Sequence, residues 1–548
     1  MWLILTSLLA ASHAALLRNA SCTECKAAFF TLKTLANEKP GNEFAYAAAD
    51  KLCRLSKIEQ LEVCEGISAE IAPIFLASLA DHYFDPEFVC FKLGSCDSPK
   101  FAQENLTEWM SGVLASKPQH IVPQPKSGTN IKFAHVTDMH FDMEYVAGSD
   151  ENCNLPLCCR SGTGTAGLWG SPKCDLPVHT LDAAIGSLSN HTDVEFIIWT
   201  GDSPPHNVWN QSQSYQLSYI TKATEILRTH FPNTPIYPVL GNHGCYPVNI
   251  YGFGEEAWLT DTLAELWGPF LPAGAADTLK TIGSYSVVHP GSKLRIISLN
   301  TQACYYFNFK LLKNATDPGH LIEWLEAEFD AAEKNGEQVF IAGHIPPGQT
   351  DCLDAWSWHY NALVERYVNI IKGQFFGHTH WDHFFINRGV FSGKPLAVEW
   401  VAPSVTPYTN LNPSYRIFEA DSLSFDIQNL YQYRMNLTHA YYFPDTTPTW
   451  DLAYDFLSAY GVTDLKPETI AALVEQFKFD ETLLLRFLDN KVTGGSLSPK
   501  ACGPSCRSKE ACLVNFGVNQ LVRECQKSPD NISTELLNLL FGPWIYQQ

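Results

Sequence analysis

Basic residues are scarce in this 548-residue chain, which has 37 Lys and Arg against 58 Asp and Glu and a formal net charge of −21. No run of Lys or Arg occurs anywhere in the sequence. Proteins that bind nucleic acids need a basic face to neutralise phosphates, so we expect no nucleic-acid partner. The 18 histidines make the net charge less negative as pH falls, which favours an acidified compartment and, as a hypothesis, an acidic working pH.

Long apolar runs are absent after the amino terminus. Residues 2–11 are mostly apolar and are followed by Ser12-His13-Ala14-Ala15, which is typical of a cleaved signal peptide over residues 1–15, although no basic residue precedes the run. No later stretch approaches the ~18 to 20 apolar residues that cross a bilayer. We therefore expect a monomeric, secreted and/or lysosomal protein that has no transmembrane segment and contacts membranes peripherally.

Internal repeats and low-complexity tracts are also absent, whereas cysteine is abundant, with 17 residues. In a chain that enters the secretory path these cysteines indicate disulfides rather than free thiols. Asn-x-Ser/Thr sequons are candidates for glycosylation and hence for the surface. They occur at Asn19, Asn105, Asn190, Asn210, Asn314, Asn436 and Asn531.

The cysteines near the amino terminus form a pattern of their own. They are Cys22, Cys25, Cys53, Cys64, Cys90 and Cys96, with spacings C-x2-C, C-x10-C and C-x5-C. Many pairings are possible, and the spacing does not choose among them. Segments such as 27–35 and 71–79 have apolar residues at helix-like intervals. A unit of this size buries only a small hydrophobic core, so disulfides would supply the missing stability. Part of its apolar surface would then stay uncovered.

Residues of metal-ligand type occur in an ordered set of short motifs through the middle of the chain. The motifs are Asp138-Met139-His140, Gly201-Asp202, Gly241-Asn242-His243, Gly343-His344 and Gly377-His378-Thr379-His380. Each follows an apolar run that predicts a strand, over residues 131–137, 194–200, 236–240, 339–342 and 373–376. Glycine before a ligand lets the chain turn sharply off the strand and approach a bound group closely.

The motifs together predict a two-metal site, although any one of them alone would be an ordinary turn. The donors are Asp138, His140, Asp202, Asn242, His344, His378 and His380. Zinc prefers imidazole and carboxylate ligands, and two ions need about eight protein ligands. The seven residues suffice if one carboxylate bridges the ions, and we assign that role to Asp202.

The ordered set resembles the calcineurin-like metallophosphoesterases over residues 131–430. The resemblance implies one ion on Asp138, His140, Asp202 and His380, and another on Asp202, Asn242, His344 and His378. Two ions roughly 3.5 to 4 Å apart polarise a phosphoryl group and activate a shared water, so phosphate-ester hydrolysis is expected. Related iron-containing phosphatases have a tyrosine where this chain has Pro205, so zinc is preferred.

Segments around the motifs are similar to those of the acid sphingomyelinases. They include residues 201–209, 343–348 and 402–404. His206 and His243 are candidate acids that would assist departure of an alkoxide, and the alternative role for both is to orient metal ligands. By resemblance, Asn249 and Tyr408 fall where the family contacts the phosphate or head group. Phe307 stands where well-known members carry an acidic residue, which puts the head-group specificity in question.

The same resemblance implies a saposin-like amino-terminal domain and a set of disulfides. The implied pairs are Cys22–Cys96, Cys25–Cys90, Cys53–Cys64, Cys153–Cys158, Cys159–Cys174, Cys304–Cys352, Cys502–Cys506 and Cys512–Cys525. A four-cysteine zinc site is the alternative for the last two pairs. Cys245 remains unpaired, either as a thiol near the metals or as an inert buried one.

We expect an α/β catalytic unit of two mixed β-sheets sandwiched between helices, flanked by two helical parts. The predicted divisions are a signal peptide over 1–15, an all-α saposin-like lipid-interacting domain over 21–98, a Pro-rich linker over 99–130, the metallophosphoesterase domain over 131–430, and a helical, disulfide-bonded subdomain over 431–548. The saposin-like part would present membrane lipid to the metal site, or merely pack on the catalytic unit.

The resemblance implies a phospholipase C type phosphodiesterase that cuts sphingomyelin to ceramide and phosphocholine by attack of a metal-bridging hydroxide on phosphorus. One alternative is a related secreted phosphodiesterase acting on nucleotides or other phospholipids. The other is a catalytically silent lipid-binding protein, which the presence of every ligand and both acid candidates argues against.

Overall fold

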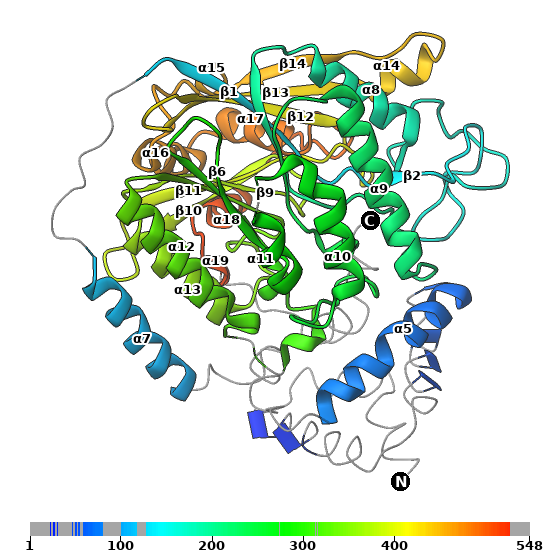
Figure 1. Cartoon of the computed structure of the whole chain (residues 1–548). Helices are drawn as coiled ribbons and strands as arrows, with labels where there is room; N and C mark the ends of the chain where they lie inside the picture. The colour runs from blue at the N-terminus through cyan, green and yellow to red at the C-terminus, as the bar shows by residue number, and fades with distance from the viewer. Residues whose placement is uncertain are drawn as a thin grey trace.

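The structure is a computed structural model (Figure 1). It describes residues 59–80, 100–117, 128–272, 274–312, 314 and 316–526, together with short pieces between residues 22 and 54. Two six-stranded sheets form its centre, and helices cover them (Figure 1).

The first sheet has the strand order β14-β13-β12-β1-β4-β5. Its strands are β1 (Asn130–Val136), β4 (Val194–Trp199), β5 (Ile236–Pro238), β12 (Ser414–Asp421), β13 (Ile427–Met435) and β14 (Trp450–Asp455). Strands β1, β4 and β5 run parallel, and β12 pairs antiparallel with β1. The parallel strands are apolar almost throughout, because both faces of this part of the sheet are covered.

The second sheet has the order β10-β11-β9-β8-β7-β6. Its strands are β6 (Tyr285–Val288), β7 (Leu294–Leu299), β8 (Gln338–Gly343), β9 (Ile371–Phe376), β10 (His383–Arg388) and β11 (Pro395–Val401). Strands β7, β8, β9 and β11 are parallel, whereas β6 and β10 are antiparallel edge strands. Strands β2 (Phe141–Asp142) and β3 (Leu176–Pro177) form a separate small pair.

The two sheets face each other through phenylalanine rings. The Phe133 ring on β1 lies 5.2 Å from that of Phe340 on β8, measured between centroids. The Phe375 ring on β9 lies 5.0 Å from that of Phe418 on β12. All four side chains are fully buried, so the sheets share one core. The predicted sandwich of two mixed sheets is confirmed.

Helices pack on the outer sides of this sandwich. Leu325 of α12 and Leu363 of α13 belong to the same core cluster as Ile341 of β8. These helices and their neighbours are α8 (Val178–Ser189), α9 (Gln213–His230), α10 (Ala257–Trp267), α11 (Ala275–Ile282), α12 (Leu321–Asn335) and α13 (Asp354–Arg366). Single 3-10 turns are η1 (Asn242–Gly244), η2 (Gly268–Phe270), η3 (Thr301–Ala303), η4 (Phe309–Leu312) and η5 (Pro318–His320).

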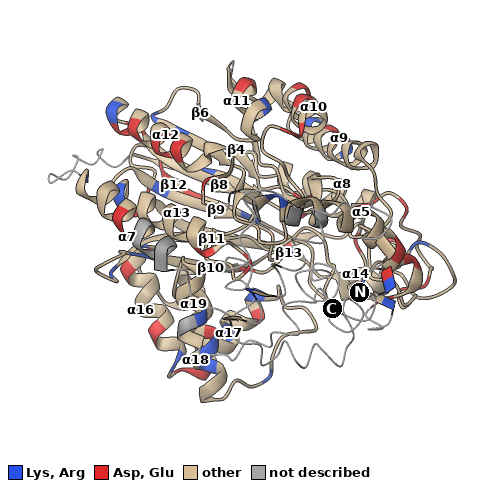
Figure 2. Ribbon diagram, turned by 90° about the horizontal axis from the view of Figure 1, so that it is seen from below, with Lys and Arg blue, Asp and Glu red and all other residues tan. Residues whose placement is uncertain are grey.

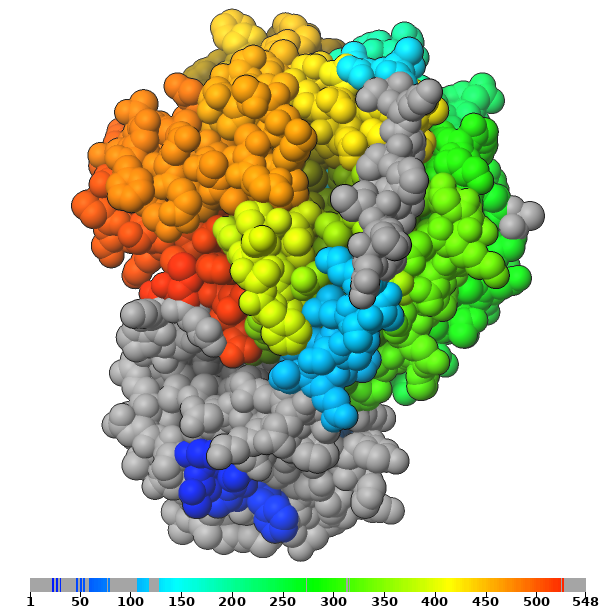
Figure 3. Space-filling model, turned by 90° about the vertical axis from the view of Figure 1, so that its left-hand side faces the viewer, coloured from blue at the N-terminus to red at the C-terminus, as the bar shows by residue number. Residues whose placement is uncertain are grey.

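The carboxyl-terminal part is helical, and its helices pack on β10 and β11 of the second sheet. Its orange and red residues lie beside yellow-green ones on the face seen in Figure 3. Its helices are α14 (Leu437–Tyr442), α15 (Phe456–Tyr460), α16 (Pro467–Phe477), α17 (Glu481–Lys491), α18 (Pro504–Val514) and α19 (Asn519–Gln526). The sequence predicts a helical subdomain over 431–548, but residues 450–455 form strand β14, which pairs with β13. After β14 the chain becomes helical again at Phe456, and the Asp455 carboxylate caps α15 by accepting the backbone N–H of Ser458.

Helix α7 (Lys100–Ala115) lies within the segment expected to be a Pro-rich linker. Met110 and Val113 are buried one turn apart, and Val113 shares a core cluster with α13. The ring of Trp109 lies 4.2 Å from that of His359 on α13. The linker expectation is therefore wrong over α7, because the apolar residues of 100–115 recur at helical spacing and dock on the catalytic unit.

Most of the expected saposin-like domain lies outside the described residues, apart from helix α5 (Leu61–Ala80) and short pieces. Helix α5 packs on the catalytic unit, since Phe75 lies 5.2 Å from Phe309 between ring centroids. A Cβ atom at Gly66 would collide with the carbonyl of Trp209, so the two backbones are in close contact.

The disulfides agree with the predicted pairing wherever both cysteines are described. The bonds are Cys53–Cys64, Cys153–Cys158, Cys159–Cys174, Cys304–Cys352, Cys502–Cys506 and Cys512–Cys525. The terminal cluster is thus disulfide-bonded rather than a zinc site. The pairs Cys22–Cys96 and Cys25–Cys90 involve cysteines outside the described residues.

Charged side chains of both signs are interspersed on outer helices such as α12 and α18, whereas the central strands carry few (Figure 2). Within the described ranges, no helix combines the length and apolar character needed to cross a membrane. The sequon residues Asn190, Asn210, Asn314 and Asn436 are all exposed, which glycosylation would require.

Candidate active site

The five motifs meet at one edge of the sandwich. They directly follow β1, β4 and β5 of the first sheet and β8 and β9 of the second. These strands are parallel within each sheet, so their carboxyl ends lie together and the turns after them converge. From the sequence, these residues were expected at the strand ends of a single sheet; they do lie at strand ends, but the strands come from two sheets that face each other.

Two buried aspartates lie at the centre of the site. Asp202 Oδ2 is 2.9 Å from His344 Nε2 and 3.6 Å from His140 Nε2. Asp138 Oδ1 is 3.5 Å from His380 Nε2 and 3.7 Å from His140 Nε2. Asp202 thus lies between two histidines assigned to different ions, as a bridging carboxylate must.

Backbone carbonyls fix the orientation of two of these histidines. His140 Nδ1 lies 2.7 Å from the carbonyl oxygen of Pro204, and His344 Nδ1 lies 2.6 Å from that of Thr200. A carbonyl can only accept, so each Nδ1 carries a proton and each Nε2 points toward the aspartates. Each ring held in this way can offer Nε2 to a metal ion, which would replace any proton there.

His378 and Asn242 form a second side of the site. His378 Nδ1 is 3.0 Å from Asn242 Oδ1. The Asn242 amide nitrogen donates to Asn249 Oδ1 at 2.8 Å, which turns the Asn242 oxygen toward His378. Asn249 was expected to contact the substrate, and the structure places its side chain against a metal-ligand candidate.

The ligand residues are held in backbone conformations that side chains rarely adopt. Positive φ angles occur at Asp138 (47°), His140 (28°), Asp202 (54°), His378 (70°) and His380 (61°). Such strain persists only where surrounding structure enforces it, and it clusters at functional sites. Glycine is required nearby, because a Cβ at Gly201 would lie 2.7 Å from the backbone nitrogen of Gly241.

The donor set fits divalent cations. Among the described residues, several buried polar atoms of the site have no hydrogen-bond partner, which is costly unless something else satisfies them. These are His140 Nε2, Asp138 Oδ1, His344 Nε2, His206 Nε2 and His243 Nδ1. Asp202 outweighs the effect of burial and raises the pKa of His344 to about 9. The carboxylates of Asp202 and Asp138 thus favour positive charge beside His344, and metal ions would supply that charge.

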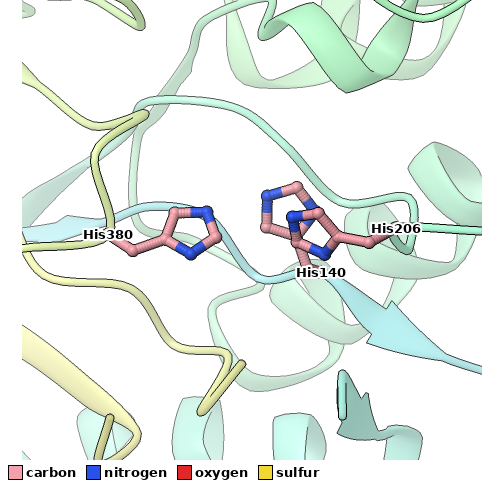
Figure 4. Close-up of side chains that lie close together, drawn as sticks. All are labelled: His140, His206 and His380. Atoms are coloured by element: carbon pink, nitrogen blue, oxygen red, sulfur yellow. The ribbon is translucent and has the colours of Figure 1, made fainter. Parts of the chain in front are cut away.

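The two acid candidates face the same centre, and Figure 4 shows the rings of His140, His206 and His380 pointing toward one another. The ring of His206 lies 4.0 Å from that of His140, and the ring of His243 lies 4.7 Å from it, between centroids. The backbone N–H of His243 also donates to Asp202 Oδ1 at 2.9 Å. Burial lowers the pKa of both His206 and His243.

Asp175 orients His206 and was not anticipated from the sequence. Its Oδ1 lies 2.8 Å from His206 Nδ1, and its Oδ2 accepts the His206 backbone N–H at 2.7 Å. Tyr408, expected to bind substrate, stacks on the His206 ring at 4.4 Å and donates its hydroxyl to the carbonyl of Pro156. Tyr408 therefore supports His206, and its hydroxyl is already engaged.

Phe307 and Cys245 lie beside the site. The ring of Phe307 is 4.1 Å from that of Tyr306 and 5.3 Å from that of Tyr305, which in turn lies 5.1 Å from the ring of His378. The buried thiol of Cys245 donates to Gln302 Oε1 at 3.1 Å. Burial raises the pKa of Cys245, which agrees with an inert thiol rather than a reactive one.

Two family models match adjoining parts of the chain. The calcineurin-like phosphoesterase model matches residues 131–382, and the model of the acid sphingomyelin phosphodiesterase C-terminal region matches residues 394–529. The fold, the convergent donors and the first match define a metallophosphoesterase, a class that works with divalent metal ions.

Curated relatives narrow the class. Sphingomyelin phosphodiesterase of Bos taurus is 36% identical over 519 residues, covering 90% of this chain and 81% of the bovine one. That of Homo sapiens is 36% identical over 530 residues, with the same shares of the two chains, 90% and 81%. Sphingomyelin phosphodiesterase A of Dictyostelium discoideum is 33% identical over 527 residues, covering 91% and 89%. The chain belongs to the acid sphingomyelin phosphodiesterase family and is a phosphodiester hydrolase.

Proposed function

We propose that the protein hydrolyses sphingomyelin to ceramide and phosphocholine. The observation that carries the proposal is the position of Asp202, whose Oδ2 lies between His140 and His344 in a chain 36% identical to sphingomyelin phosphodiesterases. Such a carboxylate suits two cations held side by side.

We assign Asp138, His140, Asp202 and His380 to one ion and Asp202, Asn242, His344 and His378 to the other, with zinc in both places. Imidazole and carboxylate donors in this number are the set that zinc prefers. When bound, the ions polarise the phosphoryl oxygens and lower the pKa of a water that attacks phosphorus.

The leaving group of this reaction is the ceramide oxygen, an alkoxide that departs poorly without a proton. When both of its nitrogens are protonated, the ring of His206 or His243 is placed to donate a proton or to stabilise charge on the phosphoryl oxygens, since each ring has a buried nitrogen without a partner. Asp175 keeps the proton of His206 on Nδ1 and turns Nε2 toward the site. Tyr408 and Asn249 act through His206 and Asn242, beside any contact they make with substrate.

We further propose that the enzyme is secreted and/or lysosomal and glycosylated, and that the saposin-like segment contacts the membrane peripherally. The disulfides and the four exposed sequon residues support passage through the secretory path. Helix α5, packed against Phe309 on the catalytic unit, supports a saposin-like part that delivers lipid close to the metal site.

The test compares hydrolysis of sphingomyelin vesicles, a nucleotide diester and an aryl phosphodiester by the purified protein, with and without added zinc. We expect zinc-dependent release of phosphocholine and slower turnover of the nucleotide. Asp202→Asn should abolish activity and metal binding, whereas Asp182→Asn, at an exposed carboxylate on α8, should change neither. A preference for the nucleotide, or full activity without any metal, would refute the proposal.

A further inference from the structure

Asp351 lies beside the metal site although it belongs to none of the five motifs. Its Oδ2 is 3.1 Å from His378 Nε2, and both side chains are mostly buried, at 19% and 11% exposure. It lies in the loop between β8 and α13, seven positions after His344. No periodicity or spacing in the sequence marks this residue.

The hydrogen bonds around His378 determine which ring nitrogen is free. The Asp351 carboxylate and the Asn242 oxygen both accept only, and the charged carboxylate is the stronger acceptor, so in the neutral ring the proton is on Nε2, facing Asp351, and Nδ1 carries a lone pair. That lone pair faces Asn242 Oδ1 at 3.0 Å, and the Asn242 oxygen is also an acceptor, since its amide nitrogen donates to Asn249. Two acceptors pointed at each other suit a shared cation.

The loop that carries Asp351 is tied to the segment beside His378. The Asp351 carbonyl accepts the backbone N–H of Tyr306 at 2.9 Å, and the neighbouring Cys352 is bonded to Cys304. Tyr305 pairs with Cys352 in a short β-bridge, and its ring packs on that of His378. The disulfide therefore joins the segment that carries Asp351 to the segment that carries Tyr305, and the Tyr305 ring packs on His378.

We propose that Asp351 is a positioning residue: it holds the proton of His378 on Nε2, leaves Nδ1 facing Asn242, and so strengthens binding of the ion shared by His378 and Asn242, with the Cys304–Cys352 disulfide keeping Asp351 in place. The inference rests on the two-ion site proposed above. Outer carboxylates of this kind orient a ligating histidine, and their loss weakens metal binding by about 10- to 100-fold.

The experiment uses the full-length protein with zinc and compares Asp351→Ala, Asp351→Asn and wild type. Asp182→Asn is the matched control, because Asp182 Oδ1 lies 3.0 Å from His230 Nε2 in a similar pair far from the motifs. Zinc content is measured after dialysis against graded concentrations of a chelator, alongside kcat and KM and the midpoint of thermal unfolding.

We expect Asp351→Ala to lose one of the two ions at about 10- to 100-fold lower chelator concentration than wild type, with a fall in kcat. Asp351→Asn keeps an accepting oxygen but loses the negative charge, so the chelator concentration at which it loses the ion should lie between those of Asp351→Ala and wild type. Unchanged retention of both ions, or a change confined to KM, would overturn the inference and make Asp351 a substrate contact or a bystander. Wild-type protein that binds no zinc would instead refute the proposed function itself.

Discussion

The Asp175 carboxylate binds His206 twice, at the ring Nδ1 through one oxygen and at the backbone N–H through the other. One carboxylate thus fixes both the backbone of His206 and the orientation of its ring, and rotation of the ring would break the hydrogen bond at Nδ1. Figure 4 shows the consequence, with the His206 ring turned toward His140 and His380.

Asp175→Asn should lower kcat on sphingomyelin by about 10- to 100-fold, a part of the 10²- to 10⁴-fold that a positioned acid or base contributes. The amide keeps the shape of the carboxylate but no longer favours the proton on Nδ1. Steady-state kinetics and zinc content together check this, since zinc content should stay at the wild-type level. Equal kcat values in variant and wild type would show that His206 needs no such partner.

His243→Ala should reduce hydrolysis of sphingomyelin far more than that of an aryl phosphodiester. A phenolate leaves without help, whereas the ceramide alkoxide needs a proton or its equivalent. The measurement is the ratio of kcat/KM for the two substrates. His230→Ala, at a partly exposed histidine on α9, should leave that ratio unchanged. Equal losses on both substrates would reject proton donation by His243.

Glu399 should make the protein more stable at acidic than at neutral pH. Burial raises the pKa of this carboxyl from 4.5 to about 8, although Asn387 and the Gly348 N–H both donate to it. The folded state thus binds a proton that the unfolded chain releases at lower pH. Its stabilising effect is complete below pH 4.5 and is lost as pH rises toward 8, at about 1.4 kcal/mol per unit of pKa difference.

Glu399→Gln should flatten this dependence, because the amide does not titrate. Thermal unfolding midpoints between pH 4.5 and 8 provide the measurement, with Glu225→Gln at an exposed position of α9 as the control. A wild-type midpoint that rises over this range would contradict the assignment.

Gly201→Ala should abolish zinc binding. Gly201 has a φ of 97°, and its added Cβ would lie 2.7 Å from the backbone nitrogen of Gly241, so the Asp202 and Asn242 turns would separate. Gly254→Ala distinguishes collision from strain, because Gly254 has a φ of 80° with nothing within 4 Å of its Cβ position. That variant should lose only about 1–2 kcal/mol of stability and keep its zinc. Retained zinc in Gly201→Ala would contradict the close packing of the two turns.

The sequence predicted that the donor residues lie close together because each motif follows a recognisable strand, and parallel strands bring such positions to the same edge of a sheet. Asp175 and Asp351 were not predicted, because each lies in an irregular loop and no motif marks it. The histidine that each carboxylate contacts is 27 or more positions away along the chain. Helix α7 and strand β14 were missed for a different reason. Prolines nearby suggested a linker for the first, and the helical pattern downstream concealed the second, whose strand is defined by pairing with β13.

Strands β13 and β14 also show that the chain does not divide at residue 430. In the first sheet, β1 comes from the start of the catalytic unit and β12 from near its end. Strand β13 spans residue 430, and β14 lies in the predicted helical subdomain. A protein ending at 430 would cut β13 in half and leave the backbone of β12 partly unpaired, an exposed edge that invites aggregation. The catalytic region and the start of the carboxyl-terminal region therefore share one sheet, and we expect them to fold together.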